Sequence, residues 1–210
     1  MTAIGTPSSL QGPRRKSPHR RDSGRSSPRR QTFLKTTDIR LNDVIERLDL
    51  HGVTLVGHSI GCDEMVRYLS RHGDGRIARI AMVAPNTPLV VKTADNPDGV
   101  DHRLLEEARA RLSKDRPCVI AVAPSAFFNT RENSVSTEMM QWWTDMMLGC
   151  SLRVLLDLTR MFTETDFRSE PSQISVPTAI IHDDSDTSAP IDRTGRKTAS
   201  LISGSQLKSV

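Results

Sequence analysis

The chain has 210 residues, of which 36% are apolar and 26% are charged, a composition typical of one soluble globular domain with its own core. It contains no run of 18 apolar residues and no apolar leader at the N-terminus. The sequence therefore predicts neither a transmembrane helix nor a secretory signal, and the expected location is the cytoplasm. Three cysteines lie far apart without metal-binding spacing, which favours free thiols over a disulfide framework or a metal centre.

The net charge of +4 is unevenly distributed along the chain. Residues 1–36 carry nine Lys/Arg and one acidic residue, whereas the remainder carries 20 Lys/Arg and 24 Asp/Glu. The basic segment is rich in Arg, Ser and Pro and has few apolar residues to bury, so we expect it to be disordered. No aromatic residue alternates with its arginines and the rest of the chain is mildly acidic, so neither nucleic acid nor a membrane is an expected partner.

From residue 37 onward the sequence alternates between helix and strand patterns. Residues 37–50 space their apolar side chains at helical intervals, which predicts an amphipathic helix. The run "VTLVG" (53–57) is β-branched and bounded by glycine, which predicts a buried strand. A helix is expected over 59–71, and "RIARIAMVA" (76–84) predicts a second buried strand.

The middle of the chain is predicted to be helical. Residues 86–100 read as a loop and residues 101–167 as nearly all helix, with amphipathic stretches at 102–113, 137–149 and 151–162. Methionine and tryptophan cluster in this region. Such a stripe is more often core, but Trp142, Trp143 and Met146 are also candidates to line an apolar substrate pocket, because methionine adapts to varied shapes.

The last part of the chain returns to the strand and helix alternation. "VPTAIIH" (176–182) predicts a third buried strand, 183–190 a polar turn, 191–202 a helix, and a further strand starts at 205. Strands that alternate with helices predict an α/β fold with a parallel sheet. The helices between the second and third strands are expected to form an insertion over one edge of that sheet.

The motif with the clearest chemical meaning is Gly57-His58-Ser59-Ile60-Gly61, between the first strand and its helix. A G-x-S-x-G sequence at a strand-to-helix junction predicts a nucleophile elbow, in which the serine sits on a sharp turn. The two glycines leave room for the strand and helix to approach. The backbone N–H of Ile60, at the helix start, is the candidate donor of an oxyanion hole.

A serine nucleophile also needs a base and an acid that orients the base. In proteins with such an elbow the chain order is serine, acid, histidine. The acid is expected at a later strand end, where Asp183, Asp184 and Asp186 are all candidates. No histidine follows them: the six are His19, His51, His58, His72, His102 and His182. We expect His58 to be held in the elbow and His182 to be a packed strand-end residue.

These motifs resemble the cofactor-free (non-haem) haloperoxidase and arylesterase group of α/β-hydrolases. The resemblance rests on the elbow, the "TDFR" run (165–168), the "IIHDDSDTSAPI" segment (180–191) and "LNDVIERLDL" (41–50). It implies a mostly parallel sheet with flanking helices, formed by 37–98 and 168–210, and a helical cap over 99–167. It also implies Ser59 as the nucleophile, Asp186 as the triad acid, and no metal or cofactor.

The same resemblance implies that the fold is incomplete at both termini. The family has further strands before the elbow, and only "HRRDSGRSSP" (19–28) resembles its second oxyanion loop, with Asp22 where a glycine is usual. The segment with the catalytic histidine would follow residue 210. The expected function is a serine hydrolase of small esters or lactones, acting through an acyl-enzyme, with perhydrolase or haloperoxidase side activity. The alternative is an inactive, truncated relative that acts as a binding or partner protein.

Overall fold

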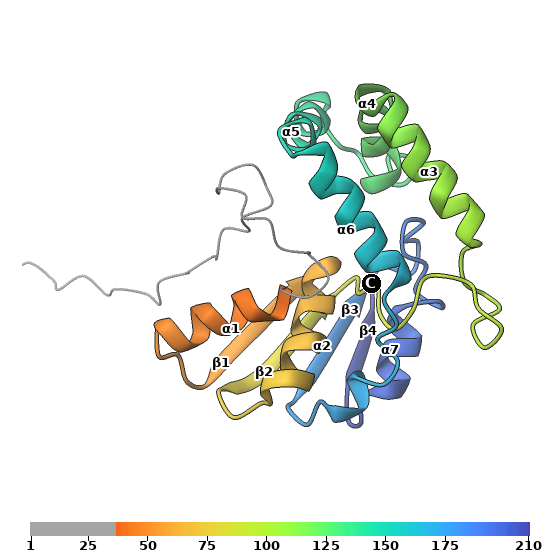
Figure 1. The fold of residues 1–210 in the computed structure, drawn as a ribbon. Helices are drawn as coiled ribbons and strands as arrows, with labels where there is room; N and C mark the ends of the chain where they lie inside the picture. The colour runs from red at the N-terminus through yellow and green to blue at the C-terminus, as the bar shows by residue number, and fades with distance from the viewer. Residues whose placement is uncertain (1–36) are drawn as a thin grey trace, which may run out of the picture.

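A four-stranded parallel sheet lies at the centre of the computed structural model, which describes residues 37–210 (Figure 1). Strands β1 (Val53–His58), β2 (Ile77–Val83), β3 (Thr178–His182) and β4 (Gln206–Ser209) stand side by side in sequence order. The predicted strands and the α/β class are thus confirmed. Because all four strands run parallel, their carboxyl ends meet at one edge of the sheet, and that edge carries the candidate site.

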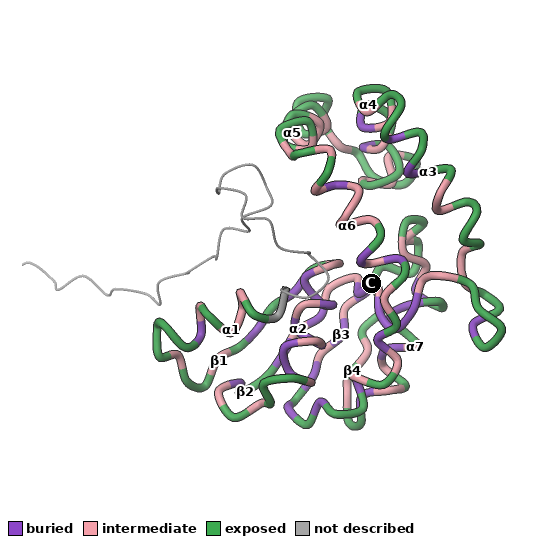
Figure 2. Tube along the Cα trace, viewed as in Figure 1, coloured by how far each residue is buried: buried purple, intermediate pink, exposed green. Residues whose placement is uncertain are grey.

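Helices α1 (Thr37–Arg47), α2 (Ile60–His72) and α7 (Gly195–Leu201) pack on one face of the sheet (Figures 1 and 2). Crossovers between parallel strands are right-handed. Since the strands stand in sequence order, the helices that connect them, α2 between β1 and β2 and α7 between β3 and β4, lie on the same face. The core between these helices and the sheet includes Ile45, Leu55, Met65, Val66, Ile80, Met82, Ile180 and Ile202. Among the described residues the opposite face of β1 stays open, since Val56 is 70% exposed.

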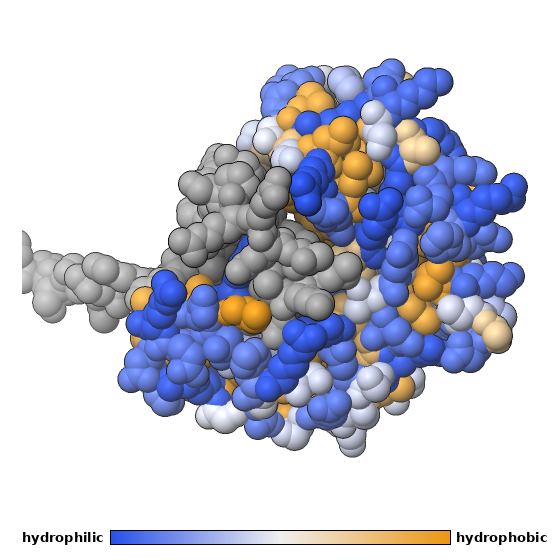
Figure 3. All heavy atoms as spheres, viewed as in Figure 1, coloured by the Kyte–Doolittle hydropathy of each residue, from blue (hydrophilic) through white to orange (hydrophobic). Residues whose placement is uncertain are grey.

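Four helices between β2 and β3 stand above the carboxyl ends of the strands (Figure 1). They are α3 (His102–Lys114), α4 (Arg116–Phe127), α5 (Thr137–Leu148) and α6 (Leu152–Glu164), and we call residues 102–164 the helical insertion. Its small core consists of Leu112, Ile120 and Leu155. Hydrophobic residues also show on the surface of this part of the molecule (Figure 3). The exposed apolar side chains of α4 and α5 include Val122, Phe127, Met139, Trp142 and Met146.

Three differences between the predicted and observed elements stand out, and the first is that the helix expected over 37–50 ends at Arg47. Residues 116–127 form α4, whose apolar side chains surround the helix instead of forming one stripe, so no amphipathic pattern marks it. The helix expected over 191–202 is shortened to α7, because residues 191–194 form turns. The segment 1–36, predicted to be disordered, lies outside the described residues. Within 37–210 no helix is long and apolar enough to cross a membrane.

Candidate active site

Ser59 occupies the sharp turn between β1 and α2. Its backbone has φ 51° and ψ −120°, a conformation that glycine normally supplies in turns. The approach of the two elements explains the neighbouring glycines. A Cβ added at Gly57 would lie 2.8 Å from the backbone carbon and oxygen of Gly61 and 2.7 Å from Sδ of Met65. The sequence G-x-S-x-G therefore permits a strand and a helix to meet at a spacing that side chains would prevent.

The start of α2 supplies a donor beside this serine. Ile60 is the first residue of the helix, and the N–H of a first helical residue has no acceptor within its own helix. The helix dipole adds partial positive charge at the same end. The backbone N–H of Ile60 is therefore suited to stabilise an oxyanion that forms on a carbonyl attacked by Ser59.

A side chain from the segment that follows β2 contacts the hydroxyl directly. Asn86 donates from Nδ2 to Oγ of Ser59 over 3.0 Å. The sheet register explains this contact, since His58 lies opposite Val83 and the N–H of Ser59 donates to the carbonyl of Val83. Sequence reasoning missed Asn86. A polar residue three positions after the carboxyl end of β2 was the signal that could have found it.

The three candidate acids of the turn after β3 differ in how firmly they are held. Asp183 and Asp184 are exposed, and the hydrogen bonds of their side-chain carboxylates go only to the nearby Ser185. The side chain of Asp186 is 16% exposed, and its Oδ1 accepts from the N–H and hydroxyl of Ser188 and the N–H of Ala189 at 2.8–2.9 Å. Asp186 is thus the one fixed carboxylate of the three.

His182, at the end of β3, contacts the carboxylate of Asp186. It is buried, its Nε2 donates to the carbonyl of Ala189 over 2.8 Å, and Nε2 lies 3.4 Å from Oδ2 of Asp186. This contact lowers the pKa of Asp186 well below its usual range, with smaller contributions from Ala189 and Ser188, while burial opposes them. Gly195 packs closely on the ring, because an added Cβ would lie 2.5 Å from Nδ1. His182 is therefore a packed strand-end residue, as expected.

Ser59 and Asp186 line one pocket of about 230 Å³ at the carboxyl edge of the sheet. The end of α4 closes one side of it with Ala126, Phe127 and Phe128, followed by Asn129 and Asn133. His58 also lines this pocket and is exposed. A histidine therefore does reach the pocket, although the structure gives it no hydrogen bond to Ser59.

The tryptophans and methionine proposed as pocket lining lie elsewhere. None of Trp142, Trp143 and Met146 is among the residues that line the pocket at Ser59. Trp142 and Met146 are exposed at 57% and 44%, and Trp143 packs on the core of the helical insertion. The reason is that α4, not α5, ends above Ser59. Trp143 reaches the site only indirectly, since its ring lies 5.1 Å from that of Phe127.

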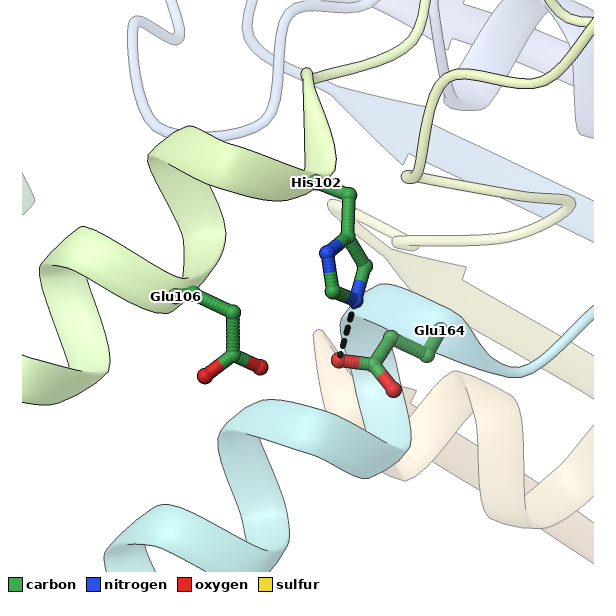
Figure 4. Close-up of side chains that lie close together, drawn as sticks. All are labelled: His102, Glu106 and Glu164. Atoms are coloured by element: carbon green, nitrogen blue, oxygen red, sulfur yellow. Dashed lines mark ion pairs between the residues drawn. The ribbon is translucent and has the colours of Figure 1, made fainter.

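A second group of polar side chains lies on the helical insertion, away from this pocket. His102 and Glu106 on α3 approach Glu164 on α6 closely enough to share a metal ion (Figure 4). Both carboxylates already pair with the buried guanidinium of Arg109, which lies 2.7 Å from Glu106 and also contacts Glu164. Arg109 lowers the pKa of Glu106 and would compete with a cation for the same oxygens.

Known proteins share this fold and about a third of the residues in the aligned part of this sequence. A family model for the alpha/beta hydrolase fold matches residues 17–210. A non-heme chloroperoxidase of Kitasatospora aureofaciens is 32% identical over 80% of this chain and 62% of its own length. A bifunctional esterase/perhydrolase of Acinetobacter calcoaceticus is 31% identical over 78% of this chain and 60% of its own. The crystal structure of a bromoperoxidase from Bacillus anthracis superposes with a TM-score of 0.84 at 30% identity, covering 89% of this chain and 69% of that one.

These findings confirm the resemblance read from the motifs. The chain spans about three fifths of the length of the curated relatives it matches. The elbow at Ser59 and the parallel sheet occur in a sequence that matches the family model over most of its length. The chain belongs to the alpha/beta hydrolase fold family.

Proposed function

With that family as the premise, we propose that this chain carries the nucleophile and the acid of a serine hydrolase that acts on small esters or lactones. The observation that supports this most is the pocket shared by Ser59, on its strained turn, and Asp186, the one fixed carboxylate after β3. A volume of about 230 Å³ suits a small substrate. The helical insertion acts as a cap, with Phe127 and Phe128 beside the substrate.

The first chemical step is the attack of Ser59. Oγ bonds to the carbonyl carbon, the π electron pair moves onto the carbonyl oxygen, and the N–H of Ile60 stabilises the resulting oxyanion. Collapse of this intermediate expels the alcohol, which takes up a proton, and leaves an acyl-enzyme. Water then releases the acid. Peroxide in place of water would give a peracid, in keeping with the perhydrolase and chloroperoxidase names of the relatives.

The hydroxyl proton must pass to a base. The 210 residues contain no histidine after Asp186, and the structure assigns Ser59 no histidine partner among the described residues. An imidazole oriented by Asp186, or a solvent base such as hydroxide, would take the proton. A low pKa keeps Asp186 ionised at neutral pH, as an acid that orients an imidazole must be.

The contacts of Ser59 favour a second candidate function, because its Oγ has Asn86 and no histidine as a hydrogen-bond partner among the described residues. A chain with the elbow and acid but no positioned base would bind small carbonyl compounds in the pocket without turning them over. As a binding or partner protein it would retain the fold and the pocket. It would lose the factor of about 10²–10⁴ that general-base catalysis contributes.

The three cysteines Cys62, Cys118 and Cys150 are free in the structure. Free thiols persist in reducing compartments, so we place the protein in the cytoplasm. Fractionation of cells that express the full natural protein would test this assignment.

The test of the proposed hydrolase is covalent labelling of the serine. A fluorophosphonate probe should add one adduct to the wild-type protein, located on Ser59 by peptide mass spectrometry. Ser59→Ala should abolish the adduct and the hydrolysis of p-nitrophenyl acetate. Ser200→Ala, an exposed serine on α7, serves as the matched control and should change neither. Binding of a small ester without any adduct would favour the binding protein.

A further inference from the structure

The contact between Asn86 and Ser59 has no counterpart in the motifs that identify the site. Asn86 follows β2, and its Nδ2 lies 3.0 Å from Oγ of the serine that the elbow presents. Asn86 is half-buried and lines the pocket together with Ser59, Asp183 and Asp186. It therefore touches the reacting atom from within the pocket.

The chemistry of an amide nitrogen decides what this contact can do. The Nδ2 group has two protons to donate and no lone pair to accept one, so Asn86 cannot be the base. It occupies a lone pair of Oγ and leaves the hydroxyl proton free to be taken by another group. Its second proton stays available for a substrate oxygen.

The position of Nδ2 also suits the charge that develops during the reaction. The oxyanion is the former carbonyl oxygen, which is bonded to the same carbon that Oγ attacks. It therefore lies close to Oγ. A donor at hydrogen-bond distance from Oγ can shift to the oxyanion with a small movement of its side chain. The two carboxylates that line the same pocket would repel an oxyanion, which increases the need for a neutral donor there.

We propose that Asn86 is a catalytic residue: its Nδ2 orients Oγ of Ser59 in the free protein and donates to the oxyanion in the transition state, as the partner of the Ile60 N–H. This assignment rests on the proposed hydrolase function. It adds a side-chain donor to the backbone donors that the family resemblance implies, the N–H of Ile60 and the loop at 19–28.

The experiment compares rates of fluorophosphonate labelling, in which the Oγ–P bond forms, the P–F bond breaks, fluoride leaves and the proton passes to a solvent base. Asn86→Ala should slow labelling by about 10²–10³, the loss typical of one oxyanion donor. Asn86→Asp has nearly the same shape but adds a negative charge, so it should be slower than Asn86→Ala. Asn42→Ala, a half-buried asparagine on α1 outside the pocket, should match the wild type.

Three outcomes would overturn the assignment, and they separate it from the proposed function. Labelling of Asn86→Ala at the wild-type rate overturns the role of Asn86 and leaves Ser59 as the nucleophile. Faster labelling of Asn86→Asp than of Asn86→Ala means that an acceptor, not a donor, is needed. No labelling of Ser59 in any protein overturns both proposals.

A second measurement tests the contact without any reaction. The side-chain amide signal of Asn86 in a ¹⁵N NMR spectrum can be assigned by its loss in Asn86→Asp. In Ser59→Ala this signal should shift, because its acceptor is gone, while the signal of Asn42 stays in place. An unchanged Asn86 signal would contradict the hydrogen bond on which the proposal rests. Equal unfolding temperatures of Asn86→Ala and wild type would exclude a merely structural effect.

Discussion

The backbone conformation of Ser59 should lower the free energy of unfolding, and substitution by glycine should raise it again. Its φ of 51° and ψ of −120° lie in a region that residues with a Cβ rarely adopt, and the hydroxyl is not the cause. The comparison of Ser59→Gly with Ser59→Ala isolates this cost. Both variants lose Oγ and the hydrogen bond from Asn86, but only alanine keeps a Cβ on the turn.

The size of the effect follows from two opposing terms. Strain of this kind costs about 1–3 kcal/mol, and glycine loses about 0.4–1 kcal/mol through the larger freedom of its unfolded chain. Ser59→Gly should therefore be more stable than Ser59→Ala by about 1–2 kcal/mol. For a domain of this size that difference corresponds to a rise in Tm of roughly 2–8 °C.

Thermal unfolding followed by circular dichroism measures the difference. Ser70 provides the matched control because it lies inside α2, where glycine is less stable than alanine by about 1 kcal/mol. The order of the two variants should thus reverse between positions 59 and 70. If Gly is less stable than Ala at both positions, the turn at Ser59 stores no strain and the argument fails.

Three further outcomes follow from the same geometry. Gly57→Ala should lower the free energy of unfolding by about 1–3 kcal/mol, because its Cβ would press on backbone that cannot move away. Gly75→Ala should not lower it, since a Cβ there has open space around it and the residue has no positive φ. Equal unfolding temperatures of the two variants would contradict the close approach at Gly57. Because the folded protein depresses the pKa of Asp186, its contribution to stability is complete above the unfolded carboxyl value of about 4 and is lost as the pH falls below it. Asp186→Asn should reduce the dependence of the unfolding free energy on pH below about 4, and it should impair ester hydrolysis far more than Asp183→Asn. The reverse order would mean that Asp183 is the triad acid. Added imidazole should accelerate labelling of Ser59 by about tenfold or more, a part of the about 10²–10⁴ that a positioned base supplies. A rate independent of imidazole would mean that Ser59 already has a positioned base.

The sequence alone predicted the parts of this protein that depend on near neighbours in the chain. The β-branched runs predicted β1, β2 and β3 at nearly the observed bounds, because an apolar run that is rich in β-branched residues and too short for a helix favours a buried strand. The sequence also predicted the turn between β1 and α2. Gly57, Ser59 and Gly61 lie within five residues, so the spacing itself carries the strand-to-helix turn.

The tertiary structure alone decided which residues share the pocket. Asn86 meets Ser59 through the pairing of β1 with β2, and Asp186 reaches the same pocket from the turn after β3. Nothing in the local pattern separates Asp186 from Asp183, because the difference lies in the donors that fold around it and in the buried His182 beneath. The pairing of strands and the length of α4 are set by packing over the whole domain, and they bring together residues that the sequence holds far apart.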